Sequence, residues 1–271
     1  MVEHREALAV FVAGPATLAF LVGRALSQSV FPDIRVFQGK QCHLAYPIGY
    51  RRAKHRILFL TSNPPETTRL ELDEELRAVQ QELRGSEHRE RFQLEPKPAT
   101  RTGDLLAHLR DVKPTILHVS GHGCSDGVLL RNGSGASQVI SGDDLATALE
   151  AARCFVRILI LNACHSDTQA EALLAHADCV IAMSGQILDE DAKWFAVGFY
   201  GGLGARESVA TAFKQGCARL ALERAGTRSG PREVELADPA AMTPDTHHEF
   251  PKLHVRDGVD PGAIVLAEDW K

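Results

Sequence analysis

The stretch VRILILNACHSDT, residues 156–168, decides how this chain folds. Residues 156–161 are almost continuously apolar, which is typical of a strand buried on both faces of a parallel sheet. The apolar run stops at Asn162, and the thiol of Cys164 follows just after the strand. A thiol in this place is a nucleophile, a metal ligand or a small buried hydrophobic side chain.

Strand-like and helix-like segments alternate along most of the chain. Two helix starts carry the pattern of a capping box, Ser141–Asp144 and Thr168–Glu171. Such alternation predicts βαβ units, so we expect an α/β fold with a mainly parallel central sheet and helices on both faces. Strands are predicted at 56–61, 91–96, 115–120, 155–161 and 178–184, a hairpin at 126–141, and helices at 72–83, 103–112, 189–202 and 206–223.

The composition is that of an ordinary globular protein, with 44% hydrophobic and 24% charged residues among 271. A net charge of −5 with mixed signs gives no reason to expect binding to a nucleic-acid backbone, so we expect no DNA partner. The six cysteines lack the spacing of a disulfide framework, and thiols at strand ends are typical of a reducing compartment. We therefore expect a cytoplasmic protein.

Residues 7–23 carry no charge and raise the question of a membrane segment. A transmembrane helix needs about 20 apolar residues, whereas this run is interrupted at Gly14 and Pro15 and closed by Arg24. The residues in front of it lack the basic character of a signal peptide. We expect a strand, a Gly-Pro turn and a helix with Pro15 in its first position, and no membrane partner.

Two strand ends carry side chains suited to catalysis. The strand at 115–120 runs into HVSGHG, which contains His122, and the strand at 155–161 runs into LILNACHS, which contains Cys164. If these strands are neighbours in a parallel sheet, both side chains emerge at the same edge. An imidazole in hydrogen-bond reach takes the proton of a thiol and later gives it to a leaving amine. We therefore expect a His122–Cys164 catalytic pair.

The glycines beside His122 fit this interpretation. Gly121 and Gly123 let the backbone turn and approach a substrate carbonyl. The backbone N–H groups of Gly123 and Cys164 are candidate oxyanion donors, which typically contribute about 2.7–4 kcal/mol each. The helix expected to start near Thr168 directs its positive end toward the thiol and favours the thiolate.

Other interpretations of these residues stay open at this point. A cysteine that ends a buried strand is most often a small hydrophobic side chain, and a lone histidine is most often a satisfied core residue. We expect no metal, because the histidines and cysteines lack paired spacing, and no cofactor, because the chain has no phosphate-binding glycine motif. The residues considered as a metal cluster are His118, His122, Cys124, Cys164 and His165, of which His118 lies inside a strand and is expected in the core.

The segments HVSGHG, DGVLL and VRILILNACHSDTQAEALLAHADCVIAMSGQILDEDAKWF occur in this order, and ILFLTSNPPETTRLELDEELRAVQQELR precedes them. Residues 55–225 therefore resemble CHAT domains, the caspase-like cysteine peptidases related to separase. The resemblance implies a caspase-like three-layer α/β/α sandwich. It also implies that His122 is the base and Cys164 the nucleophile of an endopeptidase that cuts a protein substrate through an acyl-enzyme.

The same resemblance suggests how a substrate is selected. NACHS is similar to the metacaspase pattern, but Asn162 stands where that pattern has an aspartate that lines an acidic pocket. MSGQILDEDA is similar to separase-like members, in which an acidic residue after the fifth strand meets a basic side chain. Asp189, with Asp191 as the alternative, is the candidate for selecting arginine or lysine. Asp189 as a helix N-cap is the competing interpretation, and His165 is read as structural.

Residues 1–50 resemble the closing strand–helix–strand of a SAVED domain, a cyclic-oligonucleotide sensor of bacterial antiviral systems. A complete sensor is several times longer, so the chain would hold only the end of one. The resemblance implies a protease of phage or type III CRISPR defence that a cyclic oligoadenylate switches on through a complete SAVED domain. The alternative is an ordinary βαβ element that extends the central sheet.

Residues 226–271 are expected to form a flexible connection and a C-terminal extension, with one strand at AIVLA, residues 263–267. Two rival functions remain beside the peptidase: a catalytically silent caspase-like scaffold, and a signal-sensing module that acts by binding. Assembly into a homo-oligomer or filament fits the peptidase and the sensor alike.

Overall fold

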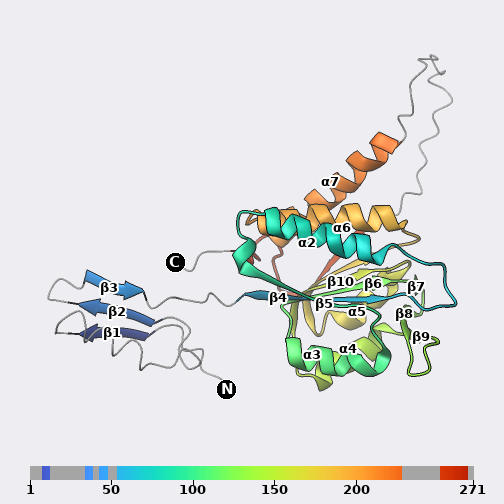
Figure 1. The fold of residues 1–271 in the computed structure, drawn as a ribbon, viewed down its shortest axis with the longest axis horizontal. Helices are drawn as coiled ribbons and strands as arrows, with labels where there is room; N and C mark the ends of the chain where they lie inside the picture. Colours follow the sequence, from blue (N-terminus) through green and yellow to red (C-terminus); the bar gives the residue numbers. More distant parts are fainter. Residues whose placement is uncertain (1–7, 13–33, 39–42, 48–53, 228–250, 268–271) are drawn as a thin grey trace, which may run out of the picture. The chain divides into compact units, whose positions relative to one another are not determined.

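A computed structural model of the chain describes residues 8–12, 34–38, 43–47, 54–227 and 251–267 (Figure 1). The chain divides into two compact units, Met1–Ala53 and Lys54–Lys271. Each unit has a sheet of its own, and the larger one carries the strand ends singled out above.

A six-stranded sheet forms the centre of the larger unit, in the order β12-β11-β10-β6-β4-β5. All neighbouring strands run parallel except β12, which pairs antiparallel with β11. The mainly parallel sheet predicted from the sequence is therefore confirmed. The strands are β4 (His55–Ser62), β5 (Phe92–Lys97), β6 (Ile116–Gly121), β10 (Val156–Asn162), β11 (Ala177–Met183) and β12 (Pro251–Val255).

Helices cover both faces of this sheet and complete a three-layer α/β/α sandwich (Figure 1). Successive side chains of a strand point to opposite faces, so Leu159 packs in one core and Ile160 in the other. This double burial explains the continuous apolar character of β10. One layer holds α2 (Leu72–Gly85), α6 (Asp189–Gly204) and α7 (Val209–Thr227), and the other holds α3 (Leu105–Val112), α4 (Gly142–Ala151) and α5 (Ala170–Leu173).

A small antiparallel sheet follows β6, as the predicted hairpin at 126–141 requires. It contains β7 (Gly123–Cys124), β8 (Gly127–Arg131) and β9 (Ser137–Ile140). The capping box at the start of α4 is confirmed, because Ser141 Oγ accepts from the Asp144 amide at 3.1 Å and Asp144 accepts from the Ser141 amide at 3.0 Å.

The second predicted capping box, Thr168–Glu171, is wrong. The chain leaves Cys164 through a 3-10 helix, η3 (Ser166–Gln169), and α5 begins only at Ala170 without a side-chain cap. Thr168 Oγ1 instead donates to the Ser125 carbonyl at 2.8 Å. The Thr168 hydroxyl therefore ties the turn after Cys164 to the loop after β7.

The C-terminal strand is not where the sequence suggested. Residues 263–267 form no strand; Ile264, Leu266 and Ala267 pack in the core, and backbone carbonyls of this region accept from the start of α7. The Val209 amide donates to the Ile264 carbonyl and the Ala210 amide to the Pro261 carbonyl, so this segment satisfies the start of a helix. The strand is β12, which lies just after residues 228–250; the predicted flexible connection thus falls outside the described residues.

The smaller unit contains three strands, β1 (Leu8–Val12), β2 (Ile34–Gln38) and β3 (His43–Pro47). β1 and β2 are parallel, and β2 and β3 are antiparallel. These three strands form one sheet in the order β1-β2-β3. The predicted Gly-Pro turn and helix lie outside the described residues. No helix in the described part of the chain is long and apolar enough to cross a membrane.

Candidate active site

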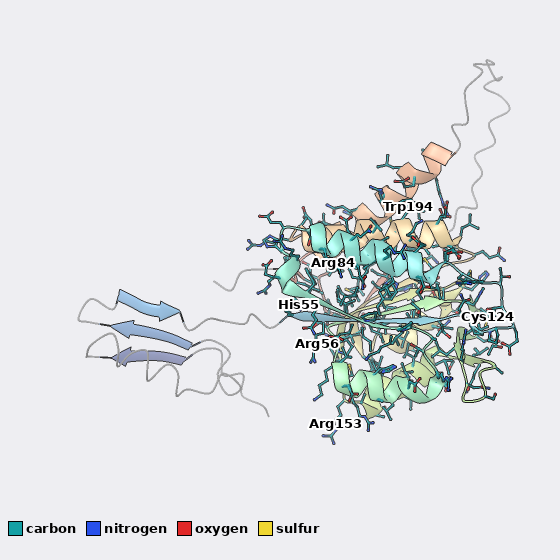
Figure 2. All side chains as sticks on the ribbon, in the orientation of Figure 1. His55, Arg56, Arg84, Cys124, Arg153 and Trp194 are labelled. Atoms are coloured by element: carbon teal, nitrogen blue, oxygen red, sulfur yellow. The ribbon has the colours of Figure 1, made fainter. Side chains whose placement is uncertain are left out.

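The carboxyl ends of β6 and β10 lie side by side, as the catalytic prediction required. The two strands are parallel neighbours, and Asn162 at the end of β10 is level with Ser120 near the end of β6. His122 and Cys164 each follow within two residues of those positions. Figure 2 shows Cys124, just beyond His122, at the opposite end of the sheet from His55 and Arg56 at the start of β4. The sheet thus delivers both side chains to one edge.

A small pocket of about 40 Å³ lies at this edge. It brings together four of the predicted site residues, His122, Cys164, Asn162 and Asp189. The rest of its wall comes from the start of α2, the end of β6 and the start of α6. Those further lining residues are Leu70, Glu71, Leu72, Glu75, Ser120, Gly121, Ile187 and Ala192.

Cys164 is half-buried and sits on a tight turn. His165, the next residue, has the left-handed backbone conformation at φ 56°, and its amide donates to the Gly185 carbonyl at 2.9 Å. This conformation is uncommon for a residue with a side chain and stops β10 abruptly. The Ile187 amide donates to the Cys164 sulfur at 3.4 Å. The loop between β11 and α6 therefore holds the thiol from one side.

His122 is oriented by a backbone carbonyl that sequence reasoning missed. Its Nε2 lies 2.6 Å from the carbonyl oxygen of Thr68. A carbonyl only accepts, so Nε2 carries a proton and Nδ1 is left to take one up. Within the described residues the imidazole and the Cys164 thiol line one pocket without a direct hydrogen bond, as is common before substrate binds.

Gly123 passes so close to Cys164 that no side chain fits there. A Cβ on Gly123 would lie 2.4 Å from the Cys164 carbonyl oxygen and 3.1 Å from its nitrogen. The two backbone segments proposed to supply oxyanion donors are therefore in direct contact. Gly121 is similarly constrained, since its Cβ would lie 2.7 Å from the Ser62 carbonyl oxygen.

A buried carboxylate, Glu75, lies beneath the pocket and was also missed. Glu75 accepts from His118 Nε2 at 3.1 Å, from Asn162 Nδ2 at 2.6 Å and from Ser120 Oγ at 2.5 Å. His118 is fully buried, as predicted, and its Nδ1 lies 3.1 Å from the Tyr200 hydroxyl. Burial and then the charge of Glu75 raise the pKa of Tyr200 well above its ordinary value. The signal in the sequence was an acid three residues after Leu72, on the apolar stripe of α2.

The two candidate acids after β11 have different surroundings. Asp189 is the first residue of α6 and accepts from the Glu71 amide at 2.9 Å, while Leu188 holds the N-cap position. The N-cap interpretation of Asp189 is therefore wrong. Asp191 is buried outside the pocket and receives two hydrogen bonds from Arg224, at 3.1 and 2.7 Å.

No group of three or more His, Cys, Asp or Glu side chains that could hold a metal ion occurs in the part of the chain that the structure describes. His118 belongs to the network around Glu75, and Cys164 contacts backbone atoms. His122 Nε2 lies near the Thr68 carbonyl, and the Cys124 thiol donates to the Gly127 carbonyl at 3.6 Å.

We expect Cys164 to react with iodoacetamide well before Cys179 and Cys217 at pH 8. Burial, followed by the charge of Asp178, raises the pKa of Cys179 to about 11, and burial raises that of Cys217 to about 11. Only about one in a thousand of such thiols is ionised at pH 8, and the thiolate is the reactive form. Peptide mapping of the alkylated chain over time measures the three rates. Equal rates at all three sites would mean that Cys164 is not activated.

The chain matches a known protein family and is similar to solved structures. Residues 51–233 match the family model described as the CHAT domain. Among solved structures, a secreted C11 cysteine protease from Bacteroides thetaiotaomicron in complex with an irreversible peptide inhibitor is similar at 12% identity and a TM-score of 0.44. That similarity covers 60% of this chain and 57% of the protease, so the chain spans less than two thirds of it. Pro-sf-caspase-1 is similar at 12% identity and a TM-score of 0.43, over 78% of this chain and 94% of that one. No curated protein sequence matches the chain.

Proposed function

Since the chain belongs to the CHAT domain family of caspase-like cysteine peptidases, we propose that it is an endopeptidase whose nucleophile is Cys164 and whose base is His122. The observation that carries this proposal is the convergence of the two side chains on one pocket, from the ends of adjacent parallel strands. Two unrelated uses of a histidine and a cysteine would not require that convergence.

The proposed reaction begins when His122 Nδ1 takes the proton of the Cys164 thiol. The sulfur attacks the carbonyl carbon of the scissile peptide bond, and the C–N bond breaks as His122 returns the proton to the leaving amine. Water then attacks the thioester, with His122 again accepting a proton, and releases the new carboxyl end while restoring the thiol. Thr68 supports both steps because its carbonyl fixes the ring with Nε2 protonated.

The charge that develops on the substrate carbonyl oxygen needs donors near Cys164. We assign this role to the backbone N–H groups of Gly123 and Cys164, whose segments are in contact. Preorganised donors of this kind cost no reorganisation during the reaction, which is why they stabilise the transition state more than water does.

A cleft for the rest of the substrate adjoins the pocket. It has a volume of about 530 Å³ and shares Leu70, Glu71 and Leu72 with the pocket. An extended peptide whose selected side chain enters the pocket would continue along this cleft. We propose that the selected side chain is arginine or lysine, because the carboxylate of Asp189 lines the pocket together with the neutral amide of Asn162.

Replacing Asp189 by asparagine is expected to lower kcat/KM for peptides with arginine before the cut by about three- to tenfold. The side chain is partly exposed, so its charge is screened, and asparagine can still accept from the Glu71 amide. Initial rates on peptides with either arginine or uncharged citrulline before the cut separate the effect of side-chain charge from that of side-chain shape. Glu190→Gln, an exposed neighbour, serves as the control. An unchanged ratio between the two peptides would remove Asp189 from the selection of substrate.

We further propose that the peptidase acts in the cytoplasm as a regulated effector of bacterial antiviral defence of the type III CRISPR kind. A cyclic oligoadenylate would switch it on through a complete SAVED domain, of which residues 1–50 would be the end. The resemblance of this segment supports the proposal, and so does its separate sheet in a unit of its own. Ligand-driven assembly into a homo-oligomer or filament is the proposed form of activation.

The experiment that tests the proposed function is cleavage of a mixed-sequence peptide library by the full chain, with and without cyclic oligoadenylates. Mass spectrometry of the products gives the residue on each side of every cut. Cuts after arginine or lysine support the peptidase and its proposed selectivity, and cuts that need the nucleotide support the sensor. Peptides left intact under both conditions would favour the silent scaffold.

A further inference from the structure

The pocket beside Cys164 is strongly acidic. Among the described residues that line it, Glu71, Glu75 and Asp189 carry carboxylates, and none is a lysine or an arginine. Glu71 is exposed and Asp189 is partly exposed, so solvent screens both charges. Glu75 is different, because only 3% of it is exposed. The electrostatic character of the pocket floor is therefore set by Glu75.

The partners of Glu75 are two neutral donors and one imidazole. Asn162 and Ser120 are the neutral donors. His118 Nε2 lies 3.1 Å from Glu75, and His118 Nδ1 lies 3.1 Å from the Tyr200 hydroxyl. No lysine or arginine among the described residues lines the pocket beside Glu75, so a cation that enters the pocket gains a buried carboxylate as its partner.

The pocket floor also holds an acceptor that has no donor. Asn162 is 2% exposed, and its Nδ2 donates to Glu75 and to the Ala192 carbonyl at 3.2 Å, which fixes the orientation of the amide. Its Oδ1 has no hydrogen-bond partner among the described residues. Oδ1 thus needs an N–H group, and an ammonium or guanidinium supplies N–H donors together with a positive charge.

We propose that Glu75 is the principal determinant of substrate selectivity, and that it binds the ammonium or guanidinium group of the residue before the cut while Asn162 Oδ1 accepts one of its N–H groups. This inference rests on the proposed peptidase function. It assigns the main charge that selects the substrate to Glu75 on α2 instead of Asp189 after β11. Asn162 acts through its amide as the second acceptor.

Entry into the pocket involves its rim. A volume of about 40 Å³ holds little more than water, and the hydrogen bond between Asp189 and the Glu71 amide spans the rim. A basic side chain enters only when Asp189 leaves that amide and turns to the incoming cation. Asp189 then meets the cation at the surface, and Glu75 retains it below.

The test compares two chloromethyl ketone peptides that differ only in ending with arginine or with citrulline, its neutral isostere. Each alkylates Cys164 with loss of chloride, and intact mass gives the rate on the full chain. The variants are Glu75→Gln, the same change combined with Asn162→Asp, and Glu74→Gln as the matched control. Glu74 precedes Glu75 on α2 but is exposed and pairs with Arg77 at 2.8 Å. Asn162→Asp places a carboxylate on the pocket floor again, at the residue that is hydrogen-bonded to Glu75 in the wild type.

We expect the wild type and Glu74→Gln to prefer the arginine probe by about 100-fold, the range typical for a desolvated charge pair. Glu75→Gln should reduce that preference to less than about tenfold while the citrulline rate stays within about threefold. The double variant should again prefer the arginine probe over the citrulline probe, by at least about tenfold. A preference that survives Glu75→Gln overturns the inference, and so does an equal loss of both rates, which would make Glu75 a structural residue alone.

The same variants separate this inference from the proposed function. Labelling needs a reactive thiol and a selective pocket, whereas hydrolysis of the matched peptides also needs the acyl-enzyme to be resolved. A chain that shows the expected labelling pattern but hydrolyses neither peptide would contradict the peptidase and support Glu75. A chain that hydrolyses both peptides with the same ratio in every variant would support the peptidase and overturn Glu75.

Discussion

Cys164→Ala is expected to abolish peptide cleavage, with a loss in kcat/KM of roughly 10⁴-fold or more. Alanine keeps the backbone and its N–H group in place but removes the sulfur that forms the thioester. Rates on an arginine peptide, followed over several hours, are sensitive enough to detect the residual reaction. The effect is large because only the sulfur can form the carbon–sulfur bond of the thioester. Without that bond, the proposed base, oxyanion donors and pocket have no reaction to assist.

Cys217→Ala is the control for this experiment. Cys217 packs against the core around α6 and α7, and burial raises its pKa to about 11, so its removal should leave kcat/KM within about twofold. Substantial cleavage by the Cys164→Ala chain would show that another group or a contaminating enzyme carries the activity. Loss in both variants would instead indicate a damaged fold, which a thermal melt of each chain detects.

Asp191→Ala is expected to lower the free energy of unfolding by about 3 kcal/mol. The carboxylate is buried and binds Arg224 through both oxygens, so its loss leaves a guanidinium in a site built for an ion pair. Urea titration of the full chain, followed by circular dichroism, measures the change. The preference for arginine over citrulline should stay as in the wild type, because Asp191 does not line the pocket.

Glu190→Ala gives the matched comparison, since this neighbour on α6 is exposed and a surface change of this type is usually worth less than about 0.5 kcal/mol. If Asp191→Ala left stability unchanged but removed the preference for arginine, Asp191 would be the selecting acid after all. The two acids that the sequence could not separate are thus distinguished by different observables, stability for Asp191 and selectivity for Asp189.

The fold and the placement of His122 and Cys164 at one edge of the sheet were predictable because their signals are local. Continuous apolar residues mark β10 as a strand buried on both faces, and the alternation with helices makes the sheet parallel. Parallel neighbours end at one edge, so His122 and Cys164 had to approach each other once β6 and β10 were adjacent. Nothing beyond strand order was needed for that step.

Other parts of the site depend on contacts that leave no pattern in the sequence. The Thr68 carbonyl orients His122, yet every residue has a carbonyl, and only the path of the loop before α2 aims this one. Glu75 looks like one more charge on an amphipathic helix until its burial is known. The capping box at Thr168 failed because the turn at His165 places the hydroxyl toward Ser125.

The pairing of β12 with β11 has a further consequence, which concerns solubility. β11 is buried along all seven of its residues, and β12 occupies the edge that β11 would otherwise present. An uncovered apolar edge is a template for strands of other molecules, whereas the opposite edge, β5, is protected by Pro96 and Lys97. A chain cut before residue 251 would lose the strand that covers this edge. It should then self-associate through β11, with aggregation that grows with concentration and is visible by light scattering.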